Sequence, residues 1–176
     1  MEYLFGGQLA PYVSSTSEAV HKMLRLADVG PPDVVFDLGS GDGRIVTAAA
    51  KRGAQQAVGF ELDSELMRQA SWHVATLKSE VSQRIELRAQ DVLSAPDLSD
   101  ASVFCCFLSQ SGNSKLLPLL REHARDDSRL VSFNFRFPGI SPSVVDSVDR
   151  VDIYLYNDFG RLAREQHNQE NKNAKS

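Results

Sequence analysis

The stretch from Val34 to Arg44, VVFDLGSGDGR, decides the fold. Apolar β-forming residues come first, an acid follows at Asp37, and three glycines then lead into a segment with helical spacing. Glycine lets the backbone turn tightly and lets a ligand approach where no Cβ stands in the way. The pattern predicts a strand over 34–36 that ends at Asp37, a glycine-rich loop, and a helix over 44–51.

Alternation of strands and helices continues on both sides of this stretch. Further strands are predicted at 57–60, 85–89, 103–108, 130–135 and 151–156. Further helices are predicted at 17–27, as one long helix that is entered at Asp63 or Ser64 and continues to Val81, and between 113 and 125. Units of this length predict an α/β protein with a Rossmann-like, open, mostly parallel twisted sheet and helices on both faces. We expect one domain over residues 1–163, followed by a disordered polar tail over 164–176.

Composition narrows the class of protein. The 176 residues are 42% hydrophobic and 24% charged, which fits one globular domain and excludes disordered, collagen-like and disulfide-scaffold proteins. The net charge of −4 is unlike that of a protein with a broad basic face, so no nucleic-acid partner is expected.

The two cysteines and the apolar runs bear on location. Cys105 and Cys106 are neighbours in a predicted strand and should point to opposite faces, so they predict neither a disulfide nor a metal site. The sequence shows no signal peptide and no apolar run long enough to cross a bilayer. We expect an intracellular, cytoplasmic protein with no transmembrane segment and no metal.

Acids stand at the ends of three consecutive predicted strands, at Asp37, Glu61 and Asp91. Ligands of open α/β sheets bind at these carboxyl ends. A dinucleotide fingerprint would place its third glycine at Arg44, and Asp42 would repel a pyrophosphate. The acids suit a cation better, and S-adenosylmethionine (SAM) is a cation with a sulfonium and an ammonium group.

Each acid then has a predicted partner on SAM. Glu61, twenty residues after Gly41, is placed to accept the ribose hydroxyls. Asp91 is placed to accept the adenine amino group, with Val92 or Leu62 packed on the ring. Three acids on consecutive strands at this spacing predict the cofactor site of a class I methyltransferase.

The wider pattern resembles one family, the protein-lysine methyltransferases of the ATP synthase c-subunit and the adenine nucleotide translocase, with their shorter prokaryotic relatives. The likeness runs from about Pro11 to Asn157. It is carried by Pro11-Tyr12-Val13, Val29-Gly30-Pro31, the stretch 37–46, VGFELD at 58–63, Gln90-Asp91-Val92, the segment 113–118 and the segment 129–138. The sequence departs from the family at Gln110, where a proline is common, and at Ile140, where a tryptophan is common.

This resemblance implies a class I methyltransferase fold and a set of cofactor-binding residues. With the predictions above, the set is Tyr12, Asp37, Gly39, Gly41, Asp42, Gly43, Glu61, Leu62, Asp91 and Val92. An N-terminal segment within residues 1–17 would lie over the cofactor as a lid. The resemblance also allows a mitochondrial location, although the membrane-associating N-terminal segment of the eukaryotic members has no counterpart here.

We therefore predict SAM-dependent methyl transfer to the ε-amine of a protein lysine. The candidates for the acceptor-facing surface lie after the fourth and fifth strands, at Phe107, Ser109, Gln110 and Asn134. Two alternatives stay open. One is a methyltransferase acting on a small molecule or RNA, and the other is a non-catalytic SAM-binding module.

Overall fold

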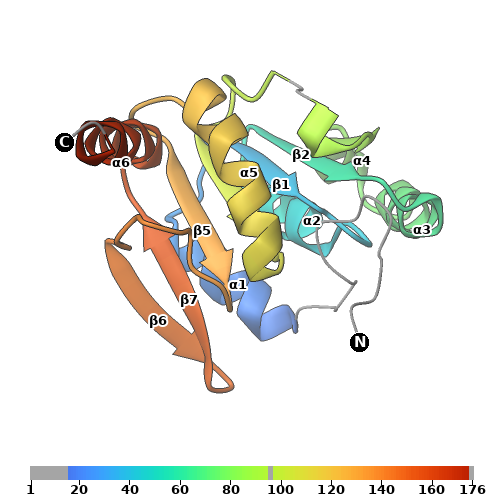
Figure 1. The fold of residues 1–176 in the computed structure, drawn as a ribbon. Helices are drawn as coiled ribbons and strands as arrows, with labels where there is room; N and C mark the ends of the chain where they lie inside the picture. Colours follow the sequence, from blue (N-terminus) through green and yellow to red (C-terminus); the bar gives the residue numbers. More distant parts are fainter. Residues whose placement is uncertain (1–15, 95–96, 175–176) are drawn as a thin grey trace, which may run out of the picture.

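The computed structural model describes residues 16–94 and 97–174, and its centre is a seven-stranded sheet in the order β3-β2-β1-β4-β5-β7-β6 (Figure 1). The strands are β1 (Val34–Leu38), β2 (Gln56–Glu61), β3 (Ile85–Ala89), β4 (Val103–Cys106), β5 (Arg129–Phe133), β6 (Val144–Val148) and β7 (Val151–Tyr156). Strands β1 to β5 are parallel, and β7 runs antiparallel between β5 and β6. This topology confirms the predicted open, mostly parallel sheet.

Helices cover both faces of the sheet. They are α1 (Ser17–Leu26), α2 (Arg44–Lys51), α3 (Ser64–Ala75), α4 (Ser79–Ser82), the short 3-10 helix η1 (Val92–Ser94), α5 (Gln110–His123) and α6 (Phe159–Asn173). In Figure 1, α5 crosses the near face of the sheet, with α6 beside it, whereas α1 and α2 lie behind. Each face has its own apolar core, with Cys106 in one and Cys105 in the other, so the opposite orientation of the two thiols is confirmed.

Capping residues begin two of the helices, α1 and α3, at the predicted positions. The Thr16 hydroxyl accepts the Ala19 amide N–H at 3.2 Å and begins α1. The Asp63 carboxylate accepts the amide N–H groups of Glu65 and Leu66 and begins α3. Each cap satisfies amide groups that have no partner within the helix.

Several predicted boundaries are wrong. Strand β1 continues through Asp37 to Leu38, β4 ends at Cys106 rather than Leu108, and β5 ends at Phe133 rather than Phe135. The predicted long helix that continues to Val81 is two helices, because α3 ends in a tighter turn in which the amides of Thr76 and Leu77 donate to the carbonyls of His73 and Val74, three residues back.

Helix α5 begins at Gln110, earlier than predicted, and contains Pro118. The Ser109 hydroxyl accepts the Gly112 amide N–H at 3.0 Å, so the helix has a capped start well before the proline. The structure also contains β6, a strand that the sequence pattern did not predict. It pairs only with β7 and has four of its five residues exposed, so it has no strong apolar pattern.

The C-terminal residues differ most from expectation. Where a disordered tail was expected from Arg164 onward, α6 continues to Asn173. Phe159 and Ala163 are buried, and the Arg164 guanidinium donates to the carbonyls of Arg121 and Ala124 at the end of α5. Packing and hydrogen bonding to α5 therefore order a segment whose own composition is polar.

Candidate functional site

The glycine loop joins β1 to α2 at the carboxyl edge of the sheet. Gly39, Gly41 and Gly43 have φ angles of 92°, 54° and 79°, in the left-handed region that glycine adopts without strain. The amides of Gly39 and Ser40 both donate to the Phe60 carbonyl, at 3.0 and 2.8 Å. The loop is thereby fastened to the end of β2.

Glu61 is a second fastening of the same loop. One of its carboxylate oxygens accepts the Gly41 amide N–H at 2.8 Å. The other accepts the amides of Leu62 and Asp63, each at 2.8 Å. A carboxylate has about four acceptor positions, so these three bonds leave about one for a ligand.

Asp37 is the most unusual group at this edge. Its side chain is 1% exposed, and neither carboxylate oxygen has a hydrogen-bond partner among the described residues. Burial, together with the smaller effect of the neighbouring charges of Glu61 and Asp42, raises the pKa of Asp37 to about 8. An unpaired buried carboxyl group costs stability unless a cation or a donor compensates it.

Asp42, another residue of the predicted cofactor-binding set, forms an ion pair in the structure. Its carboxylate accepts two bonds from the Arg44 guanidinium, at 2.8 and 2.5 Å. Its charge is therefore shared with Arg44 rather than reserved for a ligand. Gly43, the next residue, is the N-cap of α2 and has no side chain to cap it.

The third predicted acid lies after β3. One Asp91 oxygen accepts the Leu93 amide N–H at 2.9 Å, so Asp91 starts η1. Val92 is 4% exposed and packs in the core, whereas Leu62 is 49% exposed. Of the two side chains predicted to cover an adenine ring, Leu62 has the free surface.

The predicted acceptor-facing residues gather after β4 and β5. The Phe107 and Phe133 rings meet edge to face with centroids 4.6 Å apart. The Ser109 hydroxyl is engaged as the cap of α5, and the Gln110 amide nitrogen donates to the Arg136 carbonyl at 3.1 Å, which leaves its oxygen as an acceptor. Asn134 is exposed and has a left-handed φ of 70°.

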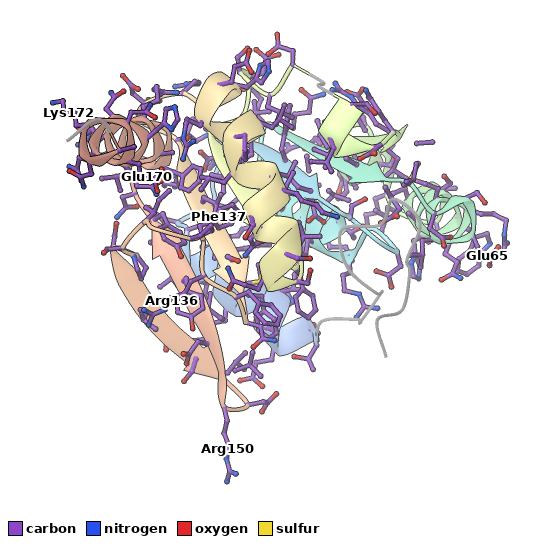
Figure 2. The ribbon with its side chains drawn as sticks, viewed as in Figure 1. Glu65, Arg136, Phe137, Arg150, Glu170 and Lys172 are labelled. Carbon is purple, nitrogen blue, oxygen red and sulfur yellow. The ribbon has the colours of Figure 1, made fainter. Side chains whose placement is uncertain are left out.

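Asn113 is a polar residue of this region that the sequence reading did not choose. It is fully buried, and its amide nitrogen lies within hydrogen-bond distance of the Ser132 hydroxyl and the carbonyls of Phe135 and Arg136. Figure 2 shows Arg136 in the loop after β5, between α5 and β7. Asn113 therefore ties the start of α5 to the loop that carries Asn134. Two signals pointed to it: it begins the segment 113–118 that carries the family resemblance, and it is a polar residue on the apolar side of a predicted helix.

Two predicted features lie outside the described residues: Tyr12, and the lid within 1–17 apart from Thr16 and Ser17 at the start of α1. Among residues 16–94 and 97–174, no group of three or more histidine, cysteine or acidic side chains is arranged to hold a metal ion. Within the same ranges, no helix has both the length and the apolar character required to cross a bilayer.

The residues at this edge fit a cationic cofactor. A buried carboxyl without a partner among the described residues, an acid with one acceptor position left and a loop with three glycines lie at the same end of the parallel strands. Acids gathered there would favour a ligand with sulfonium and ammonium charges and disfavour a pyrophosphate.

Comparison with known proteins also points to a methyltransferase. A family model described as the ANTKMT methyltransferase domain matches residues 37–144. The chain is 34% identical over 151 residues to a protein-lysine N-methyltransferase of Saccharolobus islandicus, with 83% of this chain and 92% of the relative covered. It is also 34% identical over 146 residues to the adenine nucleotide translocase lysine N-methyltransferase of Mus musculus, but it spans only 62% of that protein.

A solved structure agrees in fold and in sequence. The crystal structure of an RNA methyltransferase from Salinibacter ruber in complex with S-adenosyl-L-homocysteine has a TM-score of 0.77 and 34% identity. The match covers 82% of this chain and 93% of that one.

Proposed function

The chain belongs to the ANTKMT methyltransferase family, and from this premise we propose that it transfers a methyl group from SAM to the ε-amine of a protein lysine. It is a SAM-dependent methyltransferase with a seven-stranded Rossmann-like fold. The observation that carries the lysine assignment is the 34% identity to a protein-lysine N-methyltransferase across 92% of its length.

We propose that three acids hold the cofactor. Asp37 would face one of its positive groups, Glu61 would accept from the ribose with its remaining acceptor position, and Asp91 would accept from the adenine, next to exposed Leu62. The glycines of the loop would let the cofactor approach the backbone, and Tyr12 would contribute from the lid. When bound, SAM supplies an electrophilic methyl group on a sulfonium.

The protein must then present a neutral amine to that methyl. Free lysine has a pKa of ~10.4, so the site must remove water from the ammonium and accept its protons. The Gln110 oxygen and Asn134 are acceptors at the ends of β4 and β5, and the Phe107–Phe133 pair provides an apolar wall beside them. Alignment of the amine by these groups would supply most of the rate acceleration.

RNA is the second candidate acceptor. It is favoured by one observation, the description of the Salinibacter ruber relative as an RNA methyltransferase. The net charge of −4 supports the protein acceptor instead, since RNA-binding surfaces are usually basic. An intracellular location is compatible with both a protein and an RNA acceptor. The two buried free cysteines support such a location.

Methyl transfer from tritiated SAM into cell extract separates these candidates. We expect label that survives ribonuclease and disappears with protease. Label that survives protease and disappears with ribonuclease would support RNA, and label in small molecules would support a metabolite acceptor. SAM binding with no label in any fraction would indicate a binding module. A Glu61→Ala variant serves as the matched inactive control.

A further inference from the structure

A groove of about 500 Å³ lies outside the cofactor site, over the exposed side of α2. Residues of α1 and of the end of α3 form its walls, and α2 forms its floor. It begins at Asp42 and Arg44, next to the glycine loop, and extends along α2 to Lys51. Eight residues of helix correspond to about 12 Å, which is enough for a short extended segment of another chain.

The polar lining of this groove is rich in donors. Its single carboxylate, Asp42, is held by two bonds from Arg44. The remaining charged group is the exposed ammonium of Lys51, which forms no salt bridge within the described part of the chain. The imidazoles of His21 and His73 add ring N–H donors on opposite walls. Such a lining is complementary to carboxylates.

The apolar part of the lining indicates that the groove binds a polypeptide rather than a small anion. Val20, Ala48 and Leu77 contribute apolar surface between the donors. Trp72, the only tryptophan in the sequence, is 66% exposed, and its ring centroid is 5.7 Å from that of His73 on the wall. An exposed tryptophan beside a groove is typical of a protein interface, where it becomes an anchor.

We propose that this groove binds an acidic segment of the protein substrate, on the chain that carries the target lysine. The inference rests on the proposed function and adds a specificity determinant to it. Carboxylates of the segment would meet Lys51 and the two imidazoles, its apolar side chains would contact the floor, and Trp72 would cover it. Because the groove begins beside the glycine loop, a bound segment would lead toward the cofactor edge.

Direct binding tests this inference without requiring catalysis. Three synthetic peptides of equal length carry a central lysine flanked by glutamate, glutamine or arginine, and each is titrated while Trp72 fluorescence is followed with S-adenosylhomocysteine at saturation. We expect the glutamate peptide to change the fluorescence and to bind about tenfold more tightly than the glutamine peptide. Lys51→Glu should abolish that preference.

Lys172→Glu is the matched control. Lys172 is an exposed lysine on α6, which packs with α5 on the opposite face of the sheet (Figure 2). Equal affinities for the three peptides, or a glutamate preference that survives Lys51→Glu, would overturn the inference. So would a single-stranded RNA that binds in place of the peptides and loses its affinity in Lys51→Glu.

Methylation assays separate this inference from the function on which it rests. If the inference holds, Lys51→Glu raises KM for the glutamate peptide and leaves kcat and SAM affinity unchanged. Methylation of all three peptides with equal KM would contradict the groove alone. A glutamate peptide that binds at Trp72 and is never methylated at lysine would contradict the proposed function alone.

Discussion

Asp37 is the group at the carboxyl ends of the parallel strands whose charge state is most strongly altered by the fold. It is buried, it has no partner among the described residues, and burial with two neighbouring acids raises its pKa to about 8. Below that pH the cofactor-free chain holds a proton on Asp37. A positively charged ligand favours the ionised form, so binding and deprotonation are coupled.

SAM affinity should therefore depend on pH through Asp37. Between about pH 6 and pH 8, binding should release a proton and tighten as the pH rises, because the carboxyl no longer has to be deprotonated. Titration calorimetry in buffers with different ionisation enthalpies measures the proton release. Asp37→Asn is the control, since the amino group of SAM titrates in both proteins, and an equal proton release in both would contradict the assignment.

The stability of the cofactor-free protein should also depend on pH through Asp37, but in the opposite direction: stability falls as the pH rises, whereas SAM affinity increases. The unfolded chain releases the Asp37 proton near pH 4, and the native chain holds it up to about pH 8. The contribution of Asp37 is therefore fully present below pH 4 and is lost as the pH rises to 8. In thermal melts from pH 5 to pH 8.5, Asp37→Asn should lose less stability than the wild type. A parallel decline of both would contradict the raised pKa.

At this scale the sequence predicted the acids and the glycines but not their partners. Asp37, Glu61 and Asp91 do stand at the carboxyl ends of neighbouring strands, because strand order and direction follow from the alternation of β and α units. The pairing of Asp42 with Arg44 and the burial of Asn113 depend on how loops fold back, which spacing along the chain does not encode.

The opposite edge of the sheet holds the elements together rather than a ligand. Asp33, just before β1, is 3% exposed and forms an ion pair with Arg129 at the start of β5. It also accepts the Ser102 hydroxyl at 2.7 Å and the Gly30 amide at 2.8 Å. One side chain thus connects the beginnings of three neighbouring parallel strands.

Arg129→Met should destabilise the fold without weakening SAM binding. The change leaves the Asp33 carboxylate buried without its cation, which should cost about 3 kcal/mol in the free energy of unfolding. Denaturant titration measures this cost. Arg125→Met is the matched control, because its pair with Asp127 is exposed and should contribute less than about 1 kcal/mol. Equal effects of the two variants would refute the role of the buried pair.

Helix α6 should depend on close contact between its first turn and the end of α5. A Cβ at Gly160 would lie 2.2 Å from the Arg125 carbonyl oxygen, so Gly160→Ala should cost about 1–3 kcal/mol. Gly30→Ala is the control, since a Cβ there meets nothing within 4 Å. Unchanged melting of Gly160→Ala would contradict the packing of α6.

Elements with a clear apolar pattern were predicted, and elements without one were not. Helix α2 has the predicted bounds, and β7 has them as well. Strand β6 is exposed along most of its length, and α6 is polar apart from a few buried residues near its start, so both depend on neighbours already in place. Tertiary contact, which local pattern does not report, orders these two elements.

At the scale of the whole molecule, three regions have different roles. The acids at the carboxyl ends of the parallel strands are proposed to hold the cationic cofactor, and the groove over α2 is proposed to hold the substrate. At the opposite ends, the Asp33–Arg129 ion pair ties the strands together. The cofactor edge and the groove meet at Asp42 and Arg44. In this proposal, acceptor recognition and methyl transfer would take place on neighbouring surfaces.

The most direct test of protein-lysine methyl transfer is mass spectrometry of a protein extract incubated with the enzyme and SAM carrying a deuterated methyl group. We predict labelled methyl groups on lysine Nζ atoms, absent with Glu61→Ala and unaffected by prior ribonuclease treatment. Labelled methyl groups confined to RNA, or on protein side chains other than lysine, would contradict the account.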